Sequence, residues 1–329
     1  MPWLLLTVSG MVLIVLSADY FTNGVEWVGF YLHLEEGAVG SLLAALGTAL
    51  PETLVPVVAI IFSPDHSEAA IGLGAVLGAP LMLATIGFAV IGLGLGARKS
   101  TPNLDTSTWG TMTKDLGFFL LAFGAALVTT FLPRPIHFAM VVILLGLYLW
   151  HAWRLIKGDR HEGVLGHAPS QPLRLSQTPR KTPWLAILQV LLALIGLILG
   201  AHFFVTALDA ATKIFHFPPF LLSVIITPVA TELPEVLNSV IWIRREKDTL
   251  AVGNVTGAMA FQSSVVPALA IAFMPWSLTP LELATGTLTW LAALWIWTRS
   301  RSRSLYIKEL LTAGLFYVVY IAIVASLYT

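Results

Sequence analysis

Apolar residues run along the chain in ten long stretches that are separated by polar segments. Each stretch is close to the ~20 residues that an α-helix needs to cross the hydrocarbon core of a bilayer. The pattern therefore predicts an all-α polytopic membrane protein rather than a soluble protein with one large core. The predicted spans cover residues 3–31, 38–62, 69–96, 115–132, 135–153, 184–208, 218–243, 249–273, 279–298 and 306–328.

The polar stretch 154–183 is long enough to be a linker, and it leaves five predicted helices on each side. The two halves are also similar in sequence. With a shift of 183 positions, residues 18–52 align with residues 201–235 without a gap, and Pro51-Glu52 falls on Pro234-Glu235. Because five helices separate the copies, the second copy enters the membrane from the opposite face. We therefore predict two inverted five-helix repeats, 1–153 and 184–329, an arrangement that places a substrate site near the membrane midplane.

Lysines and arginines fall almost entirely on one side of this arrangement. Sixteen of the 18 lie on one side, in the linker, in the loops that follow the third, seventh and ninth predicted helices and, for Lys308, at the start of the last predicted span, and only Arg134 and Lys213 lie on the other side. The positive-inside rule then makes the linker cytoplasmic and places both termini outside. The N-terminal stretch could also be a signal peptide, but it has no basic n-region and belongs to the repeat. We interpret it as the first membrane helix.

Composition narrows the possible functions. The chain is 57% hydrophobic and only 11% charged, against ~25% charged for an average soluble domain. The net charge of zero gives no basic field for a nucleic acid, and a chain without cysteine has no disulfide, thiolate metal site or cysteine nucleophile. The predicted spans contain no HExxH, GxSG or paired-aspartate motif of a membrane protease. We therefore expect no enzyme, and no cofactor apart from a transported cation as ligand. The eleven tryptophans fit interfacial aromatic belts.

Three glutamates interrupt the apolar pattern beside prolines: Glu52 in the second predicted helix, and Glu232 and Glu235 in the seventh. A carboxylate at the bilayer centre costs about 2.5–3.5 kcal/mol on insertion scales, so such residues persist where they face a cavity, an ion path or each other. Pro51 and Pro234 have no N–H, which releases the carbonyl four residues earlier. Carboxylates beside free carbonyls suit a hard cation such as Ca²⁺. A structural alternative is that one acid is protonated or bonded to a neighbouring helix.

Two pairs of short motifs carry a family resemblance. The segments "GTALPE" (47–52) and "ATELPE" (230–235), followed by "GAVLGAP" (74–80) and "GNVTGAM" (253–259), resemble the α-repeats of the sodium/calcium exchanger (cation/Ca²⁺ antiporter) superfamily. The resemblance covers most of both halves and implies the ten-helix, inverted-repeat exchanger fold. It implies that Glu52 and Glu235 jointly bind Ca²⁺, with help from the carbonyls of Thr48 and Thr231. It also implies alternating access by movement of the first and sixth helices across a fixed core.

The chain departs from the family pattern at several positions that carry oxygen ligands. Serine or asparagine is replaced by Ala49, Ala75, Ala79, Leu83 and Ala258, while Glu232 and Gln262 replace further polar residues and Asn254 is retained. Because Na⁺ needs several neutral oxygens to replace its water, these losses favour protons over Na⁺ as the coupling ion. A third carboxylate favours proton uptake as well, since clustered carboxylates repel one another.

These observations together lead to the hypothesis of a secondary active antiporter that exchanges Ca²⁺, or a related cation, for H⁺. The candidate ligands are Glu52, Glu235, Thr48, Thr231, Glu232, Gln262 and Asn254. Two alternatives stay open: Na⁺/Ca²⁺ exchange in the same site, and a non-transporting family member with a degenerate ion site. The expected partners are inorganic cations, protons or Na⁺, and the lipid bilayer. The expected location is a prokaryotic inner membrane.

Overall fold

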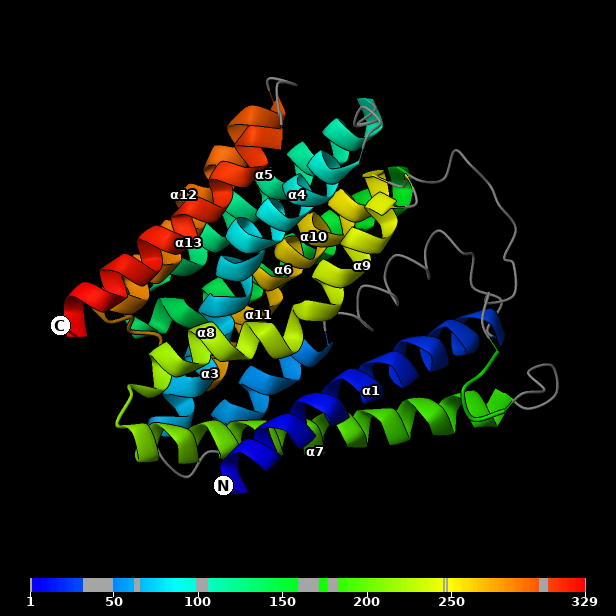
Figure 1. Cartoon of the computed structure of the whole chain (residues 1–329), viewed down its shortest axis with the longest axis horizontal. Helices are drawn as coiled ribbons and strands as arrows, with labels where there is room; N and C mark the ends of the chain where they lie inside the picture. Colours follow the sequence, from blue (N-terminus) through cyan, green and yellow to red (C-terminus); the bar gives the residue numbers. More distant parts are fainter. Residues whose placement is uncertain are drawn as a thin grey trace. The chain divides into compact units, whose positions relative to one another are not determined.

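The protein is all-helical, as the apolar pattern predicts. The computed structural model describes residues 2–31, 50–61, 66–98, 106–158, 172–176, 183–244, 246, 248–301 and 307–328, and no β-strand occurs among them (Figure 1). Residues Leu50–Ile61 form a short apolar helix. The other elements are α1 (Pro2–Tyr31), α3 (His66–Met82), the π-helix η1 (Leu83–Gly87), α4 (Phe88–Ala97), α5 (Thr106–Thr129), α6 (Arg134–Gly158), α7 (Pro183–Phe215), α8 (Pro219–Thr231), α9 (Leu233–Arg244), α10 (Asp248–Gln262), α11 (Val265–Phe273), α12 (Pro280–Arg301) and α13 (Ile307–Tyr328).

Several of these helices have the length and composition of membrane spans. Among the described residues, seven helical stretches are long and apolar enough to cross a bilayer, and the bent pair α8–α9 would make eight. Each predicted span that is fully described contains a helix or a pair of helices. The ten-span count and the inverted orientation of the halves stay predictions, because residues 38–49 lie outside the described part of the chain and α12 is not among the candidate spans.

The chain divides into two compact units, which do not follow the two halves of the sequence. Unit 1 comprises Met1–Gly72 and Tyr148–Leu222, and unit 2 comprises Leu73–Leu147 and Ser223–Thr329. Each unit therefore combines segments from both halves. The predicted division into repeats at 1–153 and 184–329, with a linker at 154–183, is a different property of the chain and stays a prediction.

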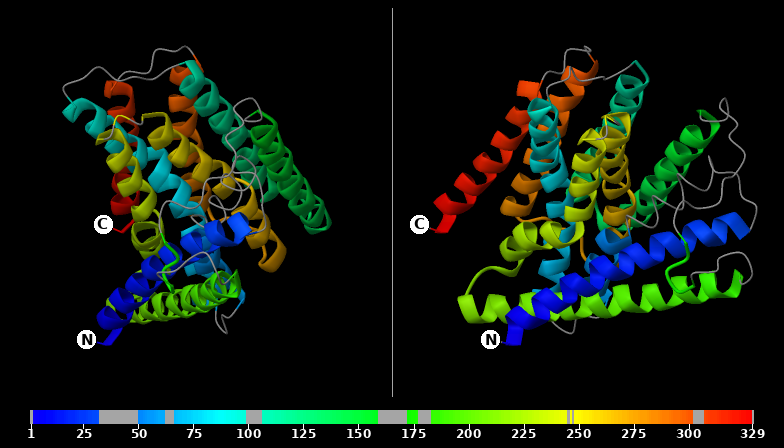
Figure 2. Two further views of the ribbon diagram at one scale, coloured as in Figure 1. Left: turned by 90° about the vertical axis from the view of Figure 1, so that its right-hand side faces the viewer. Right: turned by 45° about the vertical axis from the view of Figure 1, so that its right-hand side comes forward.

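In unit 1, α1 and α7 lie side by side along most of their length (Figures 1 and 2). They run antiparallel, since Trp3 contacts Phe215 edge to face at one end while Gly24 lies against Val190 towards the other. Glycines permit this close approach. A Cβ added at Gly10 would lie 2.9 Å from the backbone nitrogen of Phe204. Small residues at such contacts let membrane helices pack through their backbones, which is how α1 and α7 associate.

In unit 2, tryptophans join α12 and the segment before it to α5. The indole nitrogens of Trp276, Trp290 and Trp297 donate hydrogen bonds to the α5 carbonyls of Ala126, Leu120 and Thr113, at 2.8, 2.8 and 3.1 Å. A buried indole N–H needs such a partner. At least three of the eleven tryptophans thus serve as internal hydrogen-bond donors, in addition to any role at a membrane interface.

Three helical segments of the described chain are interrupted, each close to a proline. The α3–α4 segment contains Pro80 and passes through the π-helix η1. The α8–α9 segment breaks at Glu232, two residues before Pro234, and the α10–α11 segment breaks at Ser263 and Ser264, before Pro267. A proline removes the hydrogen bond to the carbonyl four residues earlier, which accounts for the breaks near Glu232 and Ser263. Two of the three breaks carry the candidate site.

An ion pair fixes the far ends of α9 and α10. The guanidinium of Arg98, which follows α4, donates two hydrogen bonds to the carboxylate of Asp248, at 2.7 and 2.8 Å, and a third to the carbonyl of Ile243. The hydrogen bonds that the Asp248 carboxylate accepts raise the pKa of Arg98, so the guanidinium stays charged. This pair ties α4, α9 and α10 together at one end of unit 2.

Candidate ion-binding site at a helix break

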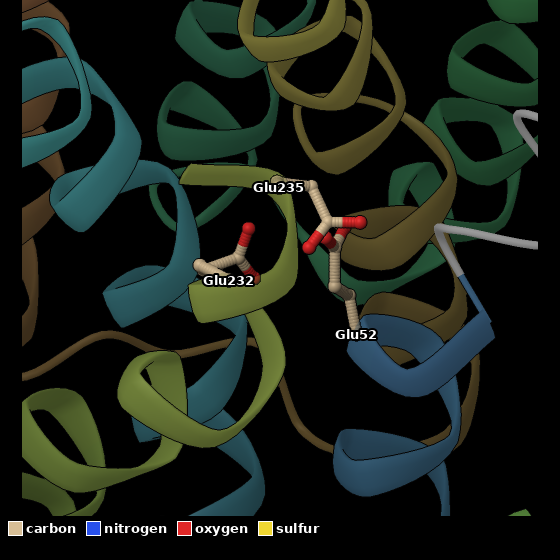
Figure 3. Close-up of side chains that lie close together, drawn as sticks. All are labelled: Glu52, Glu232 and Glu235. Carbon is tan, nitrogen blue, oxygen red and sulfur yellow. The ribbon is translucent and has the colours of Figure 1, made fainter. Parts of the chain in front are cut away.

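Two carboxylates of unit 2 flank the break between α8 and α9. Glu232 forms the turn between the helices, and Glu235 lies in the first turn of α9 (Figure 3). Residues Pro219–Thr231 and Glu235–Arg244 are inclined to each other by 44°. The sequence predicts this break from Pro234, and the structure places it at Glu232. Both side chains are buried, although each is an acid within an apolar segment.

The two carboxylates lie close together but have different surroundings. One oxygen of Glu232 lies within 4.8 Å of one oxygen of Glu235. Glu232 accepts a hydrogen bond at each oxygen, from the Thr231 hydroxyl at 3.0 Å and from the Gln262 amide at 2.9 Å. Oε2 of Glu235 is buried and has no hydrogen-bond partner among the described residues. An acceptor left unpaired in an apolar interior is costly, so a ligand that pairs with it would be bound strongly.

Gln262 reaches Glu232 because a second helix break lies opposite the first. It is the last residue of α10, and the buried residues Ser263 and Ser264 separate it from α11. The apolar pattern predicts one uninterrupted helix over 249–273, and the structure breaks it at Ser263 and Ser264. The signal was Pro267, whose missing N–H releases the carbonyl of Ser263.

The side chain of Asn254 forms a hydrogen bond with the backbone of α9 rather than with a carboxylate. Its amide nitrogen donates to the carbonyl of Glu235 at 3.0 Å and to the hydroxyl of Ser239 at 3.3 Å. Ser239 in turn donates to the carbonyls of Glu235 and of Ala251 on α10. This network holds the first turns of α9 against α10. In this structure Asn254 therefore positions the segment that carries Glu235.

The remaining candidate residues belong to the first half of the sequence. Glu52 lies in unit 1, in the described helix Leu50–Ile61, and it is buried (Figure 3). The neighbouring residue, Pro51, aligns with Pro234 when the two halves of the sequence are superposed. Thr48 lies outside the described residues. Thr231, its predicted counterpart, is the last residue of α8, where helix carbonyls lack partners within the helix.

The helix ends that meet at the break favour a cation at one point and a carboxylate at another. The C-terminal ends of α8 and α10 meet through Glu232 and Gln262. Helix C-termini carry a partial negative charge and favour a cation nearby, whereas the N-terminus of α9 favours the carboxylate of Glu235. Within unit 2 alone, the break thus combines two carboxylates, helix-end carbonyls and an amide. This set of hard oxygen donors is the type that binds Ca²⁺ or a similar cation.

Comparison with known proteins identifies the family. The sequence profile of the family described as sodium/calcium exchanger protein matches residues 2–157 and 185–326. The inner membrane protein YrbG of Escherichia coli K12 is 23% identical over 318 residues, covering 94% of this chain and 93% of YrbG. These matches span both halves of the sequence and confirm the family resemblance.

Solved structures support the same fold. The crystal structure of the H⁺/Ca²⁺ exchanger CAX has a TM-score of 0.78 and 18% sequence identity, over 98% of this chain and 82% of CAX. The sodium-calcium exchanger NCX_Mj has a TM-score of 0.57 and 19% identity, over 98% of each chain. At these identities the likeness shows the fold. Because the family profile covers most of the chain, this protein is a membrane protein of the sodium/calcium exchanger family.

Proposed function

We propose that the protein is a secondary active antiporter that exchanges Ca²⁺, or a related cation, for protons by alternating access. The cation binds Glu52 and Glu235 jointly with Glu232, and the carbonyls of Thr48 and Thr231 add oxygen ligands. Gln262 and Asn254 orient the carboxylates or complete the ligand set. Ten spans in two inverted repeats bring the two glutamate segments together at the midplane.

One observation carries this proposal: the buried oxygen of Glu235 that has no hydrogen-bond partner among the described residues, next to a second buried carboxylate. A structural role for the acids would leave both carboxylates paired, as Glu232 is. Support for Glu52 comes from its burial and from the sequence register, in which Pro51-Glu52 matches Pro234-Glu235.

Protons are the favoured counter-substrate for a reason of charge. Buried carboxylates as close as Glu232 and Glu235 do not both stay ionised without a counter-charge. When the cation leaves, a proton takes its place, and when the cation returns the proton is released. A site that holds either the cation or protons, but not both, couples the two fluxes. The fold likeness to an H⁺/Ca²⁺ exchanger is consistent with this scheme.

The proposed membrane location and orientation follow from the sequence. We propose a bacterial inner membrane, in agreement with the name of the relative YrbG. The distribution of lysine and arginine places the 154–183 linker in the cytoplasm and both termini outside.

Ion flux in proteoliposomes tests the proposal. Vesicles that contain the purified protein are loaded with ⁴⁵Ca²⁺, and a Na⁺ gradient or a pH gradient is imposed in separate sets. We expect release driven by the pH gradient, and none from Glu52→Gln or Glu235→Gln. The matched control is Asp209→Asn, which removes a carboxylate of α7 that pairs with Lys213 and is not part of the proposed site. This control is expected to keep its flux.

Each other outcome points to a specific alternative. Release driven by Na⁺ would support Na⁺/Ca²⁺ exchange, for which the fold likeness to NCX_Mj is the observation in favour. Absence of flux under both gradients, with Ca²⁺ and with Mn²⁺, Sr²⁺ or K⁺ as tracer, would contradict the antiport proposal and support a non-transporting member of the family.

A further inference from the structure

A short segment of the polar linker is bound to unit 1. Residues Pro172–Ser176 lie against α1 and α7, and Leu173 is buried with only 2% of its surface exposed. The Leu173 side chain belongs to an apolar cluster with Trp27 of α1 and Ala186 of α7. The sequence pattern treats this region as a solvated connection, so a buried leucine within it is unexpected.

The side chain of Asn23 holds the backbone on both sides of Leu173. Its amide nitrogen donates to the carbonyl of Pro172 at 3.2 Å, and its oxygen accepts from the backbone N–H of Arg174 at 3.1 Å. One amide thus pairs with a carbonyl and an N–H two residues apart, as a neighbouring β-strand would. As in peptide recognition, main-chain bonds give affinity and a side-chain pocket gives specificity, although this segment turns at Arg174 and Leu175.

Gln189 of α7 completes the arrangement. Its oxygen accepts from the N–H of Leu175 at 2.9 Å, and its nitrogen donates to the carbonyl of Tyr20 at 2.7 Å and to Asn23 at 3.0 Å. The next N–H, of Ser176, is bonded to the carbonyl of Leu173 within the segment. Three consecutive backbone N–H groups are therefore satisfied. Two almost fully buried amides of membrane helices, Asn23 and Gln189, each obtain part of their hydrogen bonds from the linker.

The segment also has a charged contact at its outer side. The Arg174 guanidinium lies 3.2 Å from the carboxylate of Asp19 on α1, and both side chains are substantially exposed. An exposed pair of this kind adds little affinity, typically about 0–1 kcal/mol. The buried leucine and the two amides account for most of the binding, and the ion pair aligns the segment along α1.

From these contacts we infer that α1 and α7 form a peptide-docking site whose occupant is the chain's own segment Pro172–Ser176. The site takes a short turn with one apolar side chain followed by a basic one. This segment of the linker is therefore a bound element of unit 1 rather than a free tether. Its release would remove the linker partners of the Asn23 amide nitrogen and the Gln189 amide oxygen, so another peptide or polar group that offers the same bonds could replace the segment. This inference is independent of the proposed ion exchange.

Hydrogen exchange of the intact protein tests the docking. In the purified full chain, we expect the amides of Arg174, Leu175 and Ser176 to exchange slowly. Gln189→Met keeps the size of the side chain but removes its hydrogen bonds, and we expect it to speed exchange of these amides about tenfold. The matched control is Thr206→Val on the exposed side of α7, which should leave the exchange unchanged.

Cross-linking provides a second measurement that does not depend on how Gln189→Met folds. The chain has no cysteine, so the double variant Asp19→Cys, Arg174→Cys places the only two thiols at the positions of the ion pair. The arginine side chain spans more than a disulfide does, so we expect rapid cross-linking by a short bis-maleimide reagent. The pair Val12→Cys, Arg174→Cys, with the first thiol about two turns further along α1, should not cross-link.

Competition tests the class of occupant. A synthetic peptide covering residues 170–178, added in excess, should slow the cross-linking of the first pair, and the same peptide with Leu173→Asp should not. The inference is overturned if the three amides exchange at the unprotected rate in the wild-type protein, or if both cysteine pairs cross-link equally. Failure of the peptide to compete would show that the site does not recognise the segment as a peptide ligand.

Discussion

Two clusters of buried polar side chains, one in each unit, satisfy their hydrogen bonds to different degrees. In unit 1, Asn23 and Gln189 are neutral amides whose oxygens and nitrogens are all engaged, by each other, by α1 and by the linker segment. In unit 2, Glu232 is engaged at both oxygens, while Oε2 of Glu235 has no partner among the described residues.

The difference separates structural polar groups from groups that await a ligand. A saturated neutral network stabilises one arrangement of the helices, and its removal leaves other groups unpaired. A buried carboxylate with an unpaired oxygen destabilises the protein until a cation or a proton arrives. Substitutions in the first cluster should therefore affect folding, and substitutions in the second should affect ion binding.

The largest expected effect is on flux, from Glu235→Gln. The amide keeps the shape of the side chain but removes the charge that attracts a cation, and we expect ⁴⁵Ca²⁺ release to fall to the background of empty vesicles. Thermal unfolding of the cation-free variant should occur at no lower temperature than in the wild type, because repulsion from Glu232 is removed. A clear loss of stability without loss of flux would show that Glu235 is structural.

Substitution of Gln189 by Met should have the opposite effects: lower stability and unchanged Ca²⁺ binding. The change leaves the Leu175 N–H and the Asn23 oxygen with fewer partners, and each buried group left unpaired costs about 1–3 kcal/mol. We expect a lower unfolding temperature in detergent, measured in the same buffer as for Glu235→Gln. The folded fraction should still bind Ca²⁺. Loss of Ca²⁺ binding at unchanged stability would break the distinction between the two clusters.

A smaller loss of stability is expected from Gly10→Ala. The added methyl group would lie 2.9 Å from the backbone nitrogen of Phe204, so α1 and α7 must move apart. Overpacking of this kind typically costs about 1–3 kcal/mol. The control is Gly146→Ala in α6, where a Cβ meets nothing within 4 Å and helix propensity favours alanine. Equal unfolding temperatures for the two variants would contradict close backbone packing of α1 on α7.

The sequence predicted the helices well because their signal is local and repeated. Apolar stretches located the helices of α1, α7 and α13 to within a few residues, except that α7 runs to Phe215 rather than ending at 208. Asp209 and Lys213, which the hydropathy pattern treats as a boundary, lie inside the helix as an ion pair one turn apart. The break at Glu232 was also predictable, because Pro234 follows it closely.

The partners of individual side chains were not predictable in the same way. Nothing local to Gln262 indicates that its amide meets Glu232, since the contact depends on how two broken helices pack. Asn254 was expected as a ligand from its place in a motif, but its amide lies on the carbonyl of Glu235. The docked segment around Leu173 could not be predicted, because a single buried leucine in a polar linker has no hydrophobic periodicity that would mark it.

The smallest expected effect concerns the ion pair of Asp19 and Arg174. Both side chains are exposed, so Arg174→Ala should lower stability by only about 0–1 kcal/mol, and less at high salt. A double-mutant cycle with Asp19→Ala, measured by thermal unfolding at low and high salt, isolates the pair. A coupling well above this range would mean that the charged contact, rather than Leu173 and the two amides, holds the linker. Coupling that is weak and disappears with salt, together with slow exchange of the Leu175 amide in Arg174→Ala, would assign the docking to the buried network.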